Sequence, residues 1–418
     1  MLTRDASTTE LFLELVGVPS PSGDELRLGT LIRDWLGAAG VAAEFDASGA
    51  QNGSDAGNLI ATVPGAAGAP AYLFVAHMDT VESGVDPVRP RLDDDGVIRS
   101  DSDTILGADN KSAVAAVMQV CRAVAQMDAA RRPTLVAAFT CREESGRMGA
   151  SLLDLSERPI DSAFSVDGSK PIGTVITRAL GQSVFTVAIR GRAAHAAANP
   201  EAGVSAIRVA AEVIAALPLG RRPGGGSVSV AAIVGGAVVD RLSPGMLSSL
   251  GVGEDADGPT AVAAALSATP TNSVPDTVAV RGEVRGFSED DIEDGARAVE
   301  DVVARVCGEH GAQYEWARDR ARVVPPMPAR PESRALALVR GAVAGLEGIE
   351  LVEEEAQATL EANYLAAHTD VVALASGGRD PHHTSESITT AELDQLEALL
   401  LRIVELGSVE FASTPEVA

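Results

Sequence analysis

Histidine or carboxylate side chains stand in five separate segments of the chain, several of which follow apolar runs. The segments are "FVAHMDT", "LGADNKSA", "CREESG", "SVDGS" and "GGRDPHHTSE", and they carry His77, Asp79, Asp109, Glu143, Glu144, Asp167, His382 and His383. Imidazole nitrogen combined with carboxylate oxygen suits zinc, and cobalt or manganese also tolerate such a ligand set. Two metals about 3.5–4 Å apart need a carboxylate that bridges them, and such a pair hydrolyses amide bonds in aminopeptidase-type sites.

Each of these residues has an ordinary structural explanation when it is taken alone. Glu143 and Glu144 follow an apolar run, and in a continuing strand they would point to opposite faces. They can serve one site only if the strand ends at Cys141 or Arg142, so that both lie in a turn. Asp109 alone suits a helix N-cap. A shared site is favoured because ligands of open α/β sheets bind outside the carboxyl ends of the strands.

Helical and strand-like segments alternate in the first part of the chain. Amphipathic periodicity, Ser/Thr caps and Gly stops predict helices over residues 7–18, 24–40 and 112–127. Apolar runs predict strands over residues 57–65, 71–79, 134–140 and 163–168, of which 71–79 is typical of a sheet buried on both faces. This alternation predicts an α/β fold, a layered sheet with helices on both faces.

A different pattern begins at Gln182 and predicts a second, smaller domain. Strands over 183–191, 226–236, 277–287 and 312–321 are interleaved with helices over 201–217 and 288–311, in the order β-α-β-β-α-β. We therefore expect residues 1–180 and 323–418 to form one domain, into which residues 181–322 insert as an α+β domain. Residues 240–270 are rich in small side chains and predict no element.

The composition of the chain disfavours some classes of binding partner and indicates a cellular compartment. There are 418 residues with 33 basic and 59 acidic side chains, and the net charge of −26 disfavours nucleic acid and anionic membranes as partners. Three scattered cysteines give no disulfide framework, which fits a reducing compartment. The first residues lack the apolar core of a signal peptide, and no 18-residue apolar run is present, so a cytoplasmic protein is expected.

Eight motifs, in order along nearly the whole chain, carry a resemblance to a known superfamily. They are "GVPSPSGDE", "FVAHMDTV", "TILGADNKSA", "REESGRMGA", "FSVDGS", "GRAAHAAANPEAGVSAI", "TNSVPDTVAVRGEVRGF" and "GGRDPHHTSESI". The chain resembles the zinc exopeptidases that include peptidase T, carboxypeptidase G, acetylornithine deacetylase and succinyl-diaminopimelate desuccinylase, and it looks most similar to peptidase T. The resemblance implies a zinc-exopeptidase catalytic domain with an inserted lid domain, through which a homodimer can form.

The resemblance also implies two divalent metal ions, with zinc as the expected metal and cobalt or manganese compatible. His77 and Asp167 resemble ligands of the first metal. Asp109 resembles the ligand that bridges both metals, and Glu144 and His382 resemble ligands of the second. A cis peptide bond follows the bridging residue in this family.

The last histidine ligand has an alternative. In the family a glutamate lies four residues beyond the ligand histidine, and Glu386 lies four residues beyond His382. This spacing favours His382, while its neighbour His383 stays open as the ligand.

The catalytic roles follow from the same resemblance. Glu143 resembles the general base that takes a proton from a metal-bridging water, and Asp79 the carboxylate that orients the imidazole of His77. His195 resembles a donor to the developing oxyanion that often reaches a site across a dimer. Asn272 and Arg285 resemble residues that hold the substrate's carbonyl or carboxylate group.

The predicted function is a dinuclear metal-dependent exopeptidase that hydrolyses short peptides, in the manner of a tripeptide aminopeptidase. The alternative within the same chemistry is an amidohydrolase that removes the acyl group from an N-acyl amino acid. A metal-binding protein without catalysis is a further alternative. A dinucleotide-binding oxidoreductase would suit the α/β pattern, but no G-x-G-x-x-G follows a first strand.

Overall fold

The computed structural model describes residues 5–82, 87–236, 263, 266–267 and 269–413. The chain divides into two compact units. The first unit comprises Met1–Ala179, Met327–Ala356 and Leu360–Ala418, and the second comprises Leu180–Pro326 and Gln357–Thr359. The segment 240–270, for which the sequence predicts no element, lies for the most part outside the described residues. Among the described residues, no helix is long and apolar enough to cross a membrane.

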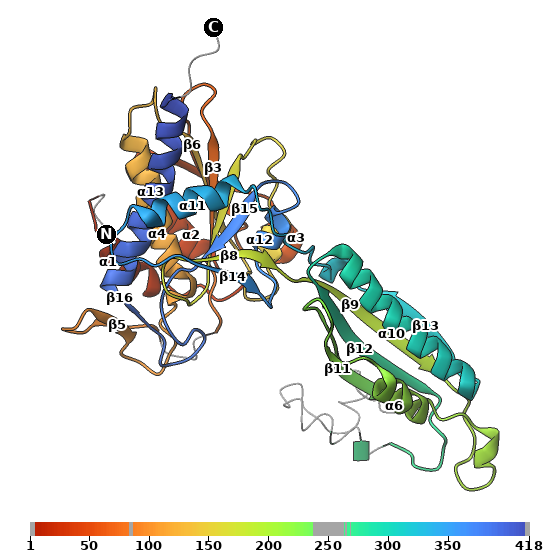
Figure 1. Ribbon diagram of the computed structural model, residues 1–418. Helices are drawn as coiled ribbons and strands as arrows, with labels where there is room; N and C mark the ends of the chain where they lie inside the picture. Colours follow the sequence, from red (N-terminus) through yellow and green to blue (C-terminus); the bar gives the residue numbers. More distant parts are fainter. Residues whose placement is uncertain (1–4, 83–86, 237–262, 264–265, 268, 414–418) are drawn as a thin grey trace. The chain divides into compact units, whose positions relative to one another are not determined.

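An eight-stranded mixed sheet forms the centre of the first unit (Figure 1). In spatial order its strands are β1 (Ala42–Phe45), β2 (Leu59–Val63), β6 (Thr134–Thr140), β3 (Ala71–His77), β7 (Ser162–Val166), β15 (Val371–Leu374), β8 (Thr174–Ala179) and β14 (Val352–Ala356). The four central strands β6, β3, β7 and β15 run parallel to one another. Strand β2 joins β6 and strand β8 joins β15 in the antiparallel sense. The carboxyl ends of the four central strands therefore meet along one edge.

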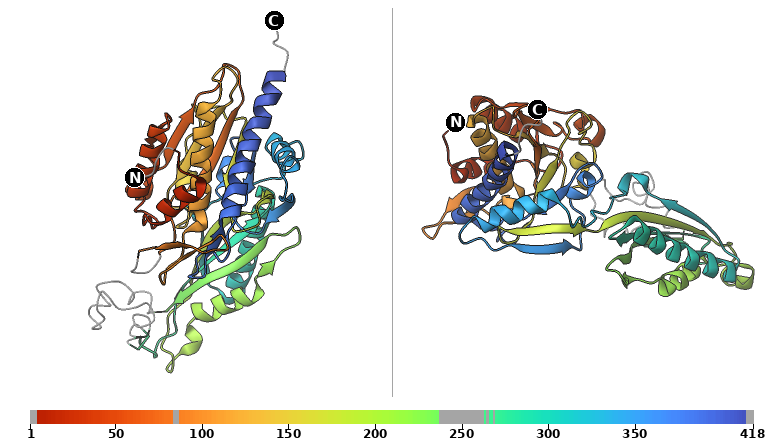
Figure 2. Two further views of the ribbon diagram at one scale, coloured as in Figure 1. Left: turned by 90° about the vertical axis from the view of Figure 1, so that its left-hand side faces the viewer. Right: turned by 45° about the horizontal axis from the view of Figure 1, so that its top comes forward.

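Helices cover both faces of this sheet. Side chains that alternate along β3 divide between two cores: Tyr72, Phe74 and Ala76 face one, and Leu73 and Val75 face the other. The first core includes α1 (Thr8–Val16), α2 (Leu26–Ala38), α4 (Ala108–Gln126), α11 (Arg334–Ala344) and α13 (Thr390–Ser413). The long helices α4 and α13 pack side by side over that face (Figures 1 and 2). The second core includes α12 (Ala362–Leu365). The predicted α/β fold with helices on both faces is confirmed.

Serine caps define where several helices begin. The Ser7 hydroxyl accepts a hydrogen bond from the Glu10 amide, and the Glu10 carboxylate accepts one from the Ser7 amide, which completes a capping box at α1. Ser333 caps α11 in the same way through the Leu336 amide. These caps satisfy amides that have no partner within the helix, and the one at Ser7 lies at the predicted start of the first helix.

Short elements complete the first unit. Strands β16 (Ser387–Thr389), β5 (Val97–Ser100) and β4 (Pro90–Leu92) form a separate three-stranded sheet. Helices α3 (Gly49–Asn52) and α5 (Met148–Ser151) are single turns.

In the part of the second unit that the structure describes, a five-stranded antiparallel sheet packs against helices α6 (Ala206–Ala216) and α10 (Glu289–His310). Its strands, in spatial order, are β10 (Gly220–Arg221), β11 (Ser227–Gly235), β12 (Thr277–Gly286), β9 (Gly181–Arg190) and β13 (Gln313–Arg318). Helices α6 and α10 share one core with the alternating side chains Phe185, Val187 and Ile189 of β9. Apart from the two-residue β10, the order of elements is the β-α-β-β-α-β order that the sequence predicts.

Candidate metal centre

The carboxyl ends of the parallel strands bring together side chains that lie far apart in the sequence. His77 is the last residue of β3 and lies opposite Thr140, the last residue of β6. Asp167 directly follows β7. Asp109 lies near the start of α4, where its backbone and that of Asn110 are not helical, and the peptide bond between them is cis as the resemblance implies. The Asn110 side chain donates to the carbonyl of Val166, and this joins the Asp109 segment to the end of β7.

One histidine and two aspartates form the first group. His77 is buried, and its Nε2 lies 3.1 Å from Oδ1 of Asp109 and 3.9 Å from Oδ1 of Asp167. Its other ring nitrogen, Nδ1, lies 2.9 Å from the main-chain carbonyl oxygen of Asp79. If Nδ1 donates to that carbonyl, Nε2 is left with a lone pair that faces the two carboxylates.

The second group uses the other oxygen of the same aspartate. Nε2 of His382 lies 2.7 Å from Oε1 of Glu144 and 3.6 Å from Oδ2 of Asp109. His383, by contrast, contacts the Ser385 hydroxyl within its own loop, with Nδ1 and Oγ 2.8 Å apart. Of the two adjacent histidines, the structure therefore brings His382 to the cluster. Asp109 presents one oxygen to each of two histidines, which is the arrangement of a bridging carboxylate.

The donor types and their spacing fit divalent metal ions. In each of these two groups, the three potential ligand atoms all lie within 4.8 Å of one another. Ligand atoms about 2.1 Å from a tetrahedral zinc are about 3.4 Å apart, and the measured separations fall on either side of that value. The set also satisfies the preference of zinc for imidazole nitrogen and carboxylate oxygen. The residues present therefore fit divalent metal ions, and Asp109 belongs to both groups.

The electrostatics of the cluster are those of crowded carboxylates that attract positive charge. Burial disfavours the protonated form of His77, but the neighbouring carboxylates, above all that of Asp109, outweigh burial and raise the pKa of His77 well above the ordinary value. Burial, together with the charge of Asp109, raises the pKa of Asp167 well above its usual range. Burial and the neighbouring carboxylates also raise the pKa of Glu144, to about 7. A bound cation would relieve this mutual repulsion.

Glu143 and Glu144 lie in a turn, where strand alternation no longer applies. Strand β6 ends at Thr140, and the turn begins beyond it. The Asp79 carboxylate accepts hydrogen bonds from the amide of Glu143 at 2.8 Å and from the amide of Glu144 at 3.1 Å. Neighbouring glutamates can therefore point at different targets, and Asp79 fixes the backbone from which both extend.

This contact gives Asp79 a function that the sequence does not reveal. The resemblance implies that its carboxylate orients His77, yet that carboxylate lies 3.6 Å from Nδ1, and the nearer acceptor is the Asp79 main-chain carbonyl. Its Oδ2 also accepts a hydrogen bond from the Ser22 hydroxyl at 2.5 Å. Asp79 thus connects the "PSPSG" loop, the end of β3 and the turn after β6.

Two further buried glutamates hold the backbone of the site, and the sequence assigns neither of them a role there. Oε1 of Glu25 accepts hydrogen bonds from the amides of Gly23 at 2.8 Å and Arg142 at 3.0 Å. Arg142 has a φ of 54°, a left-handed conformation just before Glu143 that a non-glycine residue needs contacts to maintain. Glu386 holds the segment before Asp109. Two features of the sequence could have pointed to these glutamates: Glu25 ends the "GDE" motif, and Glu386 lies four residues after His382.

The remaining predicted site residues belong to the second unit. His195 and Asn272 lie on adjoining loops, where the amide of Ala196 donates to the carbonyl of Asn272 at 2.8 Å. Nδ1 of the exposed His195 accepts from the amides of Ala197 and Ala198, so in the neutral ring Nε2 carries the proton.

Arg285 lies on β12 and pairs within its own strand. Its Nε donates to Oε1 of Glu283 at 2.7 Å. The predicted contact of Arg285 with substrate stays a prediction.

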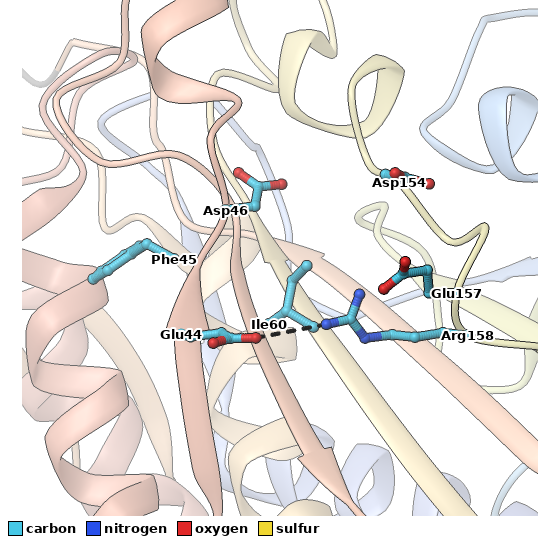
Figure 3. A pocket seen from close by; sticks show the side chains of 7 residues that line it. All are labelled: Glu44, Phe45, Asp46, Ile60, Asp154, Glu157 and Arg158. Carbon is cyan, nitrogen blue, oxygen red and sulfur yellow. Dashed lines mark ion pairs between the residues drawn. The ribbon is translucent and has the colours of Figure 1, made fainter.

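A cavity elsewhere in the first unit has different chemistry. It measures about 140 Å³ and is lined by Glu44, Phe45, Asp46, Ile60, Asp154, Glu157 and Arg158 (Figure 3). The Arg158 guanidinium lies 3.6 Å from the Glu44 carboxylate across it. This cavity adjoins strands β1 and β2, and none of the predicted ligands lines it.

Comparisons with known proteins agree with the geometry. Residues 73–406 match the family described as peptidase family M20/M25/M40. The chain is 34% identical over 220 residues to YqjE, an uncharacterized protein of Bacillus subtilis, and 26% identical over 179 residues to peptidase T of Streptococcus pyogenes. These alignments cover 53% and 36% of this chain, and 58% and 44% of the two relatives. The chain thus spans about half the length of these curated relatives.

Solved structures match over much more of the chain. The crystal structure of the aminopeptidase PepT from Bacillus cereus superposes with a TM-score of 0.81 at 27% identity, and the match covers 97% of this chain and 99% of that one. A tripeptidase from Staphylococcus aureus gives a TM-score of 0.80 over 98% of this chain and all of its own, at 24% identity, which shows a shared fold. The predicted resemblance is confirmed, and the chain belongs to peptidase family M20/M25/M40.

Proposed function

We propose that the chain is a metal-dependent exopeptidase that hydrolyses short peptides in the manner of a tripeptide aminopeptidase. The observation that carries this proposal is the placement of Asp109, whose two carboxylate oxygens face two different histidines, His77 and His382. Such a shared carboxylate is what a dinuclear hydrolytic centre requires. Support for peptides as substrates comes from the family match and from the similarity to an aminopeptidase.

Five residues would hold the metals, which we expect to be zinc, with cobalt or manganese also suited to the ligand set. They are His77, Asp109, Glu144, Asp167 and His382. When bound, the metals polarise the substrate carbonyl and lower the pKa of water.

Glu143 has the placement that a general base needs. Its amide is fixed by Asp79, and its carboxylate lies within the same few ångströms as Glu144 and His77. In the proposed reaction Glu143 accepts a proton from the attacking water and passes it to the leaving amine. The Arg147 guanidinium lies 3.5 Å from the Glu143 carboxylate.

His195 is proposed as the donor to the developing oxyanion. With Nδ1 engaged by two amides of its own loop, the proton on Nε2 is available for donation. Such donors act by stabilising charge that appears only in the transition state. Asn272, on the adjoining loop, and Arg285 are proposed to hold the substrate's carbonyl or carboxylate group, because an arginine fork suits a terminal carboxylate.

The identity of the substrate is tested by a matched panel on metal-loaded enzyme. The panel contains a tripeptide, the same tripeptide with an acetylated amino terminus, a dipeptide and an N-acetyl amino acid. We expect the free tripeptide to have the highest kcat/KM and to release its first amino acid. A preference for the N-acetyl amino acid would replace this proposal with the amidohydrolase alternative.

The two adjacent histidines provide a matched pair of variants. His382→Ala should weaken the binding of one of two metal equivalents by more than about 100-fold, because loss of a ligand exceeds the 10–100-fold typical for loss of an outer partner. His383→Ala should bind both equivalents as the wild type does, because its imidazole contacts only its own loop among the described residues. Isothermal titration of metal-free protein measures both affinities. The reverse pattern would make His383 the ligand.

A further inference from the structure

Glu386 joins two segments that each carry a candidate ligand. It is only 2% exposed and lies at the base of the loop that contains His382. Its Oε2 accepts hydrogen bonds from the amides of Leu106 at 2.8 Å and Gly107 at 2.7 Å. Its Oε1 accepts a third, from the amide of Asp109 at 2.9 Å. A single carboxylate therefore fixes three amides in the segment that presents Asp109.

The loop that carries His382 is closed on itself, with Glu386 at its closure. The main chains of Arg379 and Ser387 exchange hydrogen bonds of 2.8 and 3.2 Å, and the Glu386 amide donates to the carbonyl of His383 at 3.0 Å. His382 has a φ of 64°, so its backbone depends on its surroundings to stay in this conformation. Glu386 belongs to this loop through its main chain and binds the Asp109 segment through its side chain, so it links the two segments.

Three hydrogen bonds to one buried carboxylate restrain the segment that presents Asp109. The distance between Asp109 and His382 is thereby set through Glu386. His77 and Asp167 have other supports: His77 ends a paired strand, and the Asp167 amide donates to the carbonyl of Leu374 at 2.8 Å. Loss of Glu386 should consequently disturb the group around His382 more than the group around His77.

We propose that Glu386 is a positioning residue for the metal site formed by Asp109, Glu144 and His382. It acts by holding the two segments in register, and it contacts neither metal nor substrate. This inference rests on the proposed function, in which Asp109 and His382 are ligands.

The test replaces Glu386 with glutamine and measures two properties that do not depend on activity. Glutamine keeps the size of the side chain, but its amide nitrogen cannot accept a hydrogen bond, so at least one buried amide loses its acceptor. In the metal-free E386Q protein, hydrogen exchange at Leu106, Gly107 and Asp109 should be faster than in the wild type. In a Zn²⁺ titration, one equivalent should keep its affinity and the other should lose about 10–100-fold.

Two further variants serve as controls. Glu386→Asp keeps the carboxylate on a shorter side chain. The metal equivalent that E386Q weakens should therefore bind to this variant with an affinity between those of the wild type and E386Q. Glu10→Gln makes the same chemical change at the start of α1, where Oε2 of Glu10 accepts from the amide and hydroxyl of Ser7. E10Q should bind both equivalents as the wild type does.

The outcomes separate this inference from the proposed function. Two unchanged affinities in E386Q, or an equal loss at both equivalents, would overturn the positioning role while leaving the proposed function intact. A wild-type protein that binds no divalent metal would overturn the proposed function and this inference with it.

Discussion

Replacing Glu143 with alanine should lower the turnover of a tripeptide by about 10²- to 10⁴-fold, the range that general acid–base groups contribute. The metals should remain, because Glu143 is not among the five proposed ligands and because the Glu144 amide keeps its own hydrogen bond to Asp79. The expected result is thus a metal-loaded protein with almost no activity. Metal content by elemental analysis and single-turnover kinetics on the same sample measure both parts.

A matched control for this prediction lies elsewhere on the first unit. Glu157 lines the cavity of Figure 3, so Glu157→Ala removes the same side chain from a place without predicted ligands. This variant should retain the metals and the activity of the wild type. If Glu143→Ala were as active as Glu157→Ala, Glu143 would not be the base.

Replacing Asp109 with alanine should weaken both metal equivalents together. Its Oδ1 faces His77 and its Oδ2 faces His382, so the substitution takes one ligand from each proposed metal. Turnover should fall at least as far as in Glu143→Ala, because the metals that polarise the carbonyl would be lost along with the bridge. Isothermal titration and elemental analysis measure the loss of metal.

The variant Asp109→Asn tests the bridging role of Asp109 more specifically. Asparagine keeps the shape of the side chain and one carbonyl oxygen, but it replaces the other oxygen with a nitrogen that cannot bind a metal. One equivalent should therefore be weakened more than the other, in contrast to the joint loss in Asp109→Ala. If Asp109→Ala still bound one metal with wild-type affinity and kept full turnover, Asp109 would not be the ligand that bridges the two metals.

The central strands could be predicted from the sequence because they are buried on both faces. Strands β3 and β6 are continuous apolar runs, which indicate a buried strand without any alternation of polar and apolar residues. Strand β14 (Val352–Ala356) has the sequence "VEEEA" and was not predicted. It lies at the edge of the sheet, where pairing with β8 stabilises an acidic segment that has little strand preference of its own.

The candidate ligands could be predicted because each stands in a recognisable motif, as with His77 at the end of β3 and Asp167 directly after β7. The residues that hold the ligands in place could not. Glu25 acts on an amide 117 residues away, and Glu386 acts on amides 277 to 280 residues away. Their targets are main-chain N–H groups, which every non-proline residue has, so no local pattern marks the partners. Only the folded chain shows that these carboxylates are acceptors.

We propose that the cluster around Asp109 binds metals that make the chain a peptide hydrolase. The most direct test titrates Zn²⁺ into chelator-treated protein and measures bound metal and tripeptide turnover in the same samples. We predict no turnover in the metal-free protein, and turnover that rises with occupancy to a maximum at two metals per chain. Two bound metals without turnover of any peptide or N-acyl amino acid would contradict the account, as would turnover that persists after complete removal of metal.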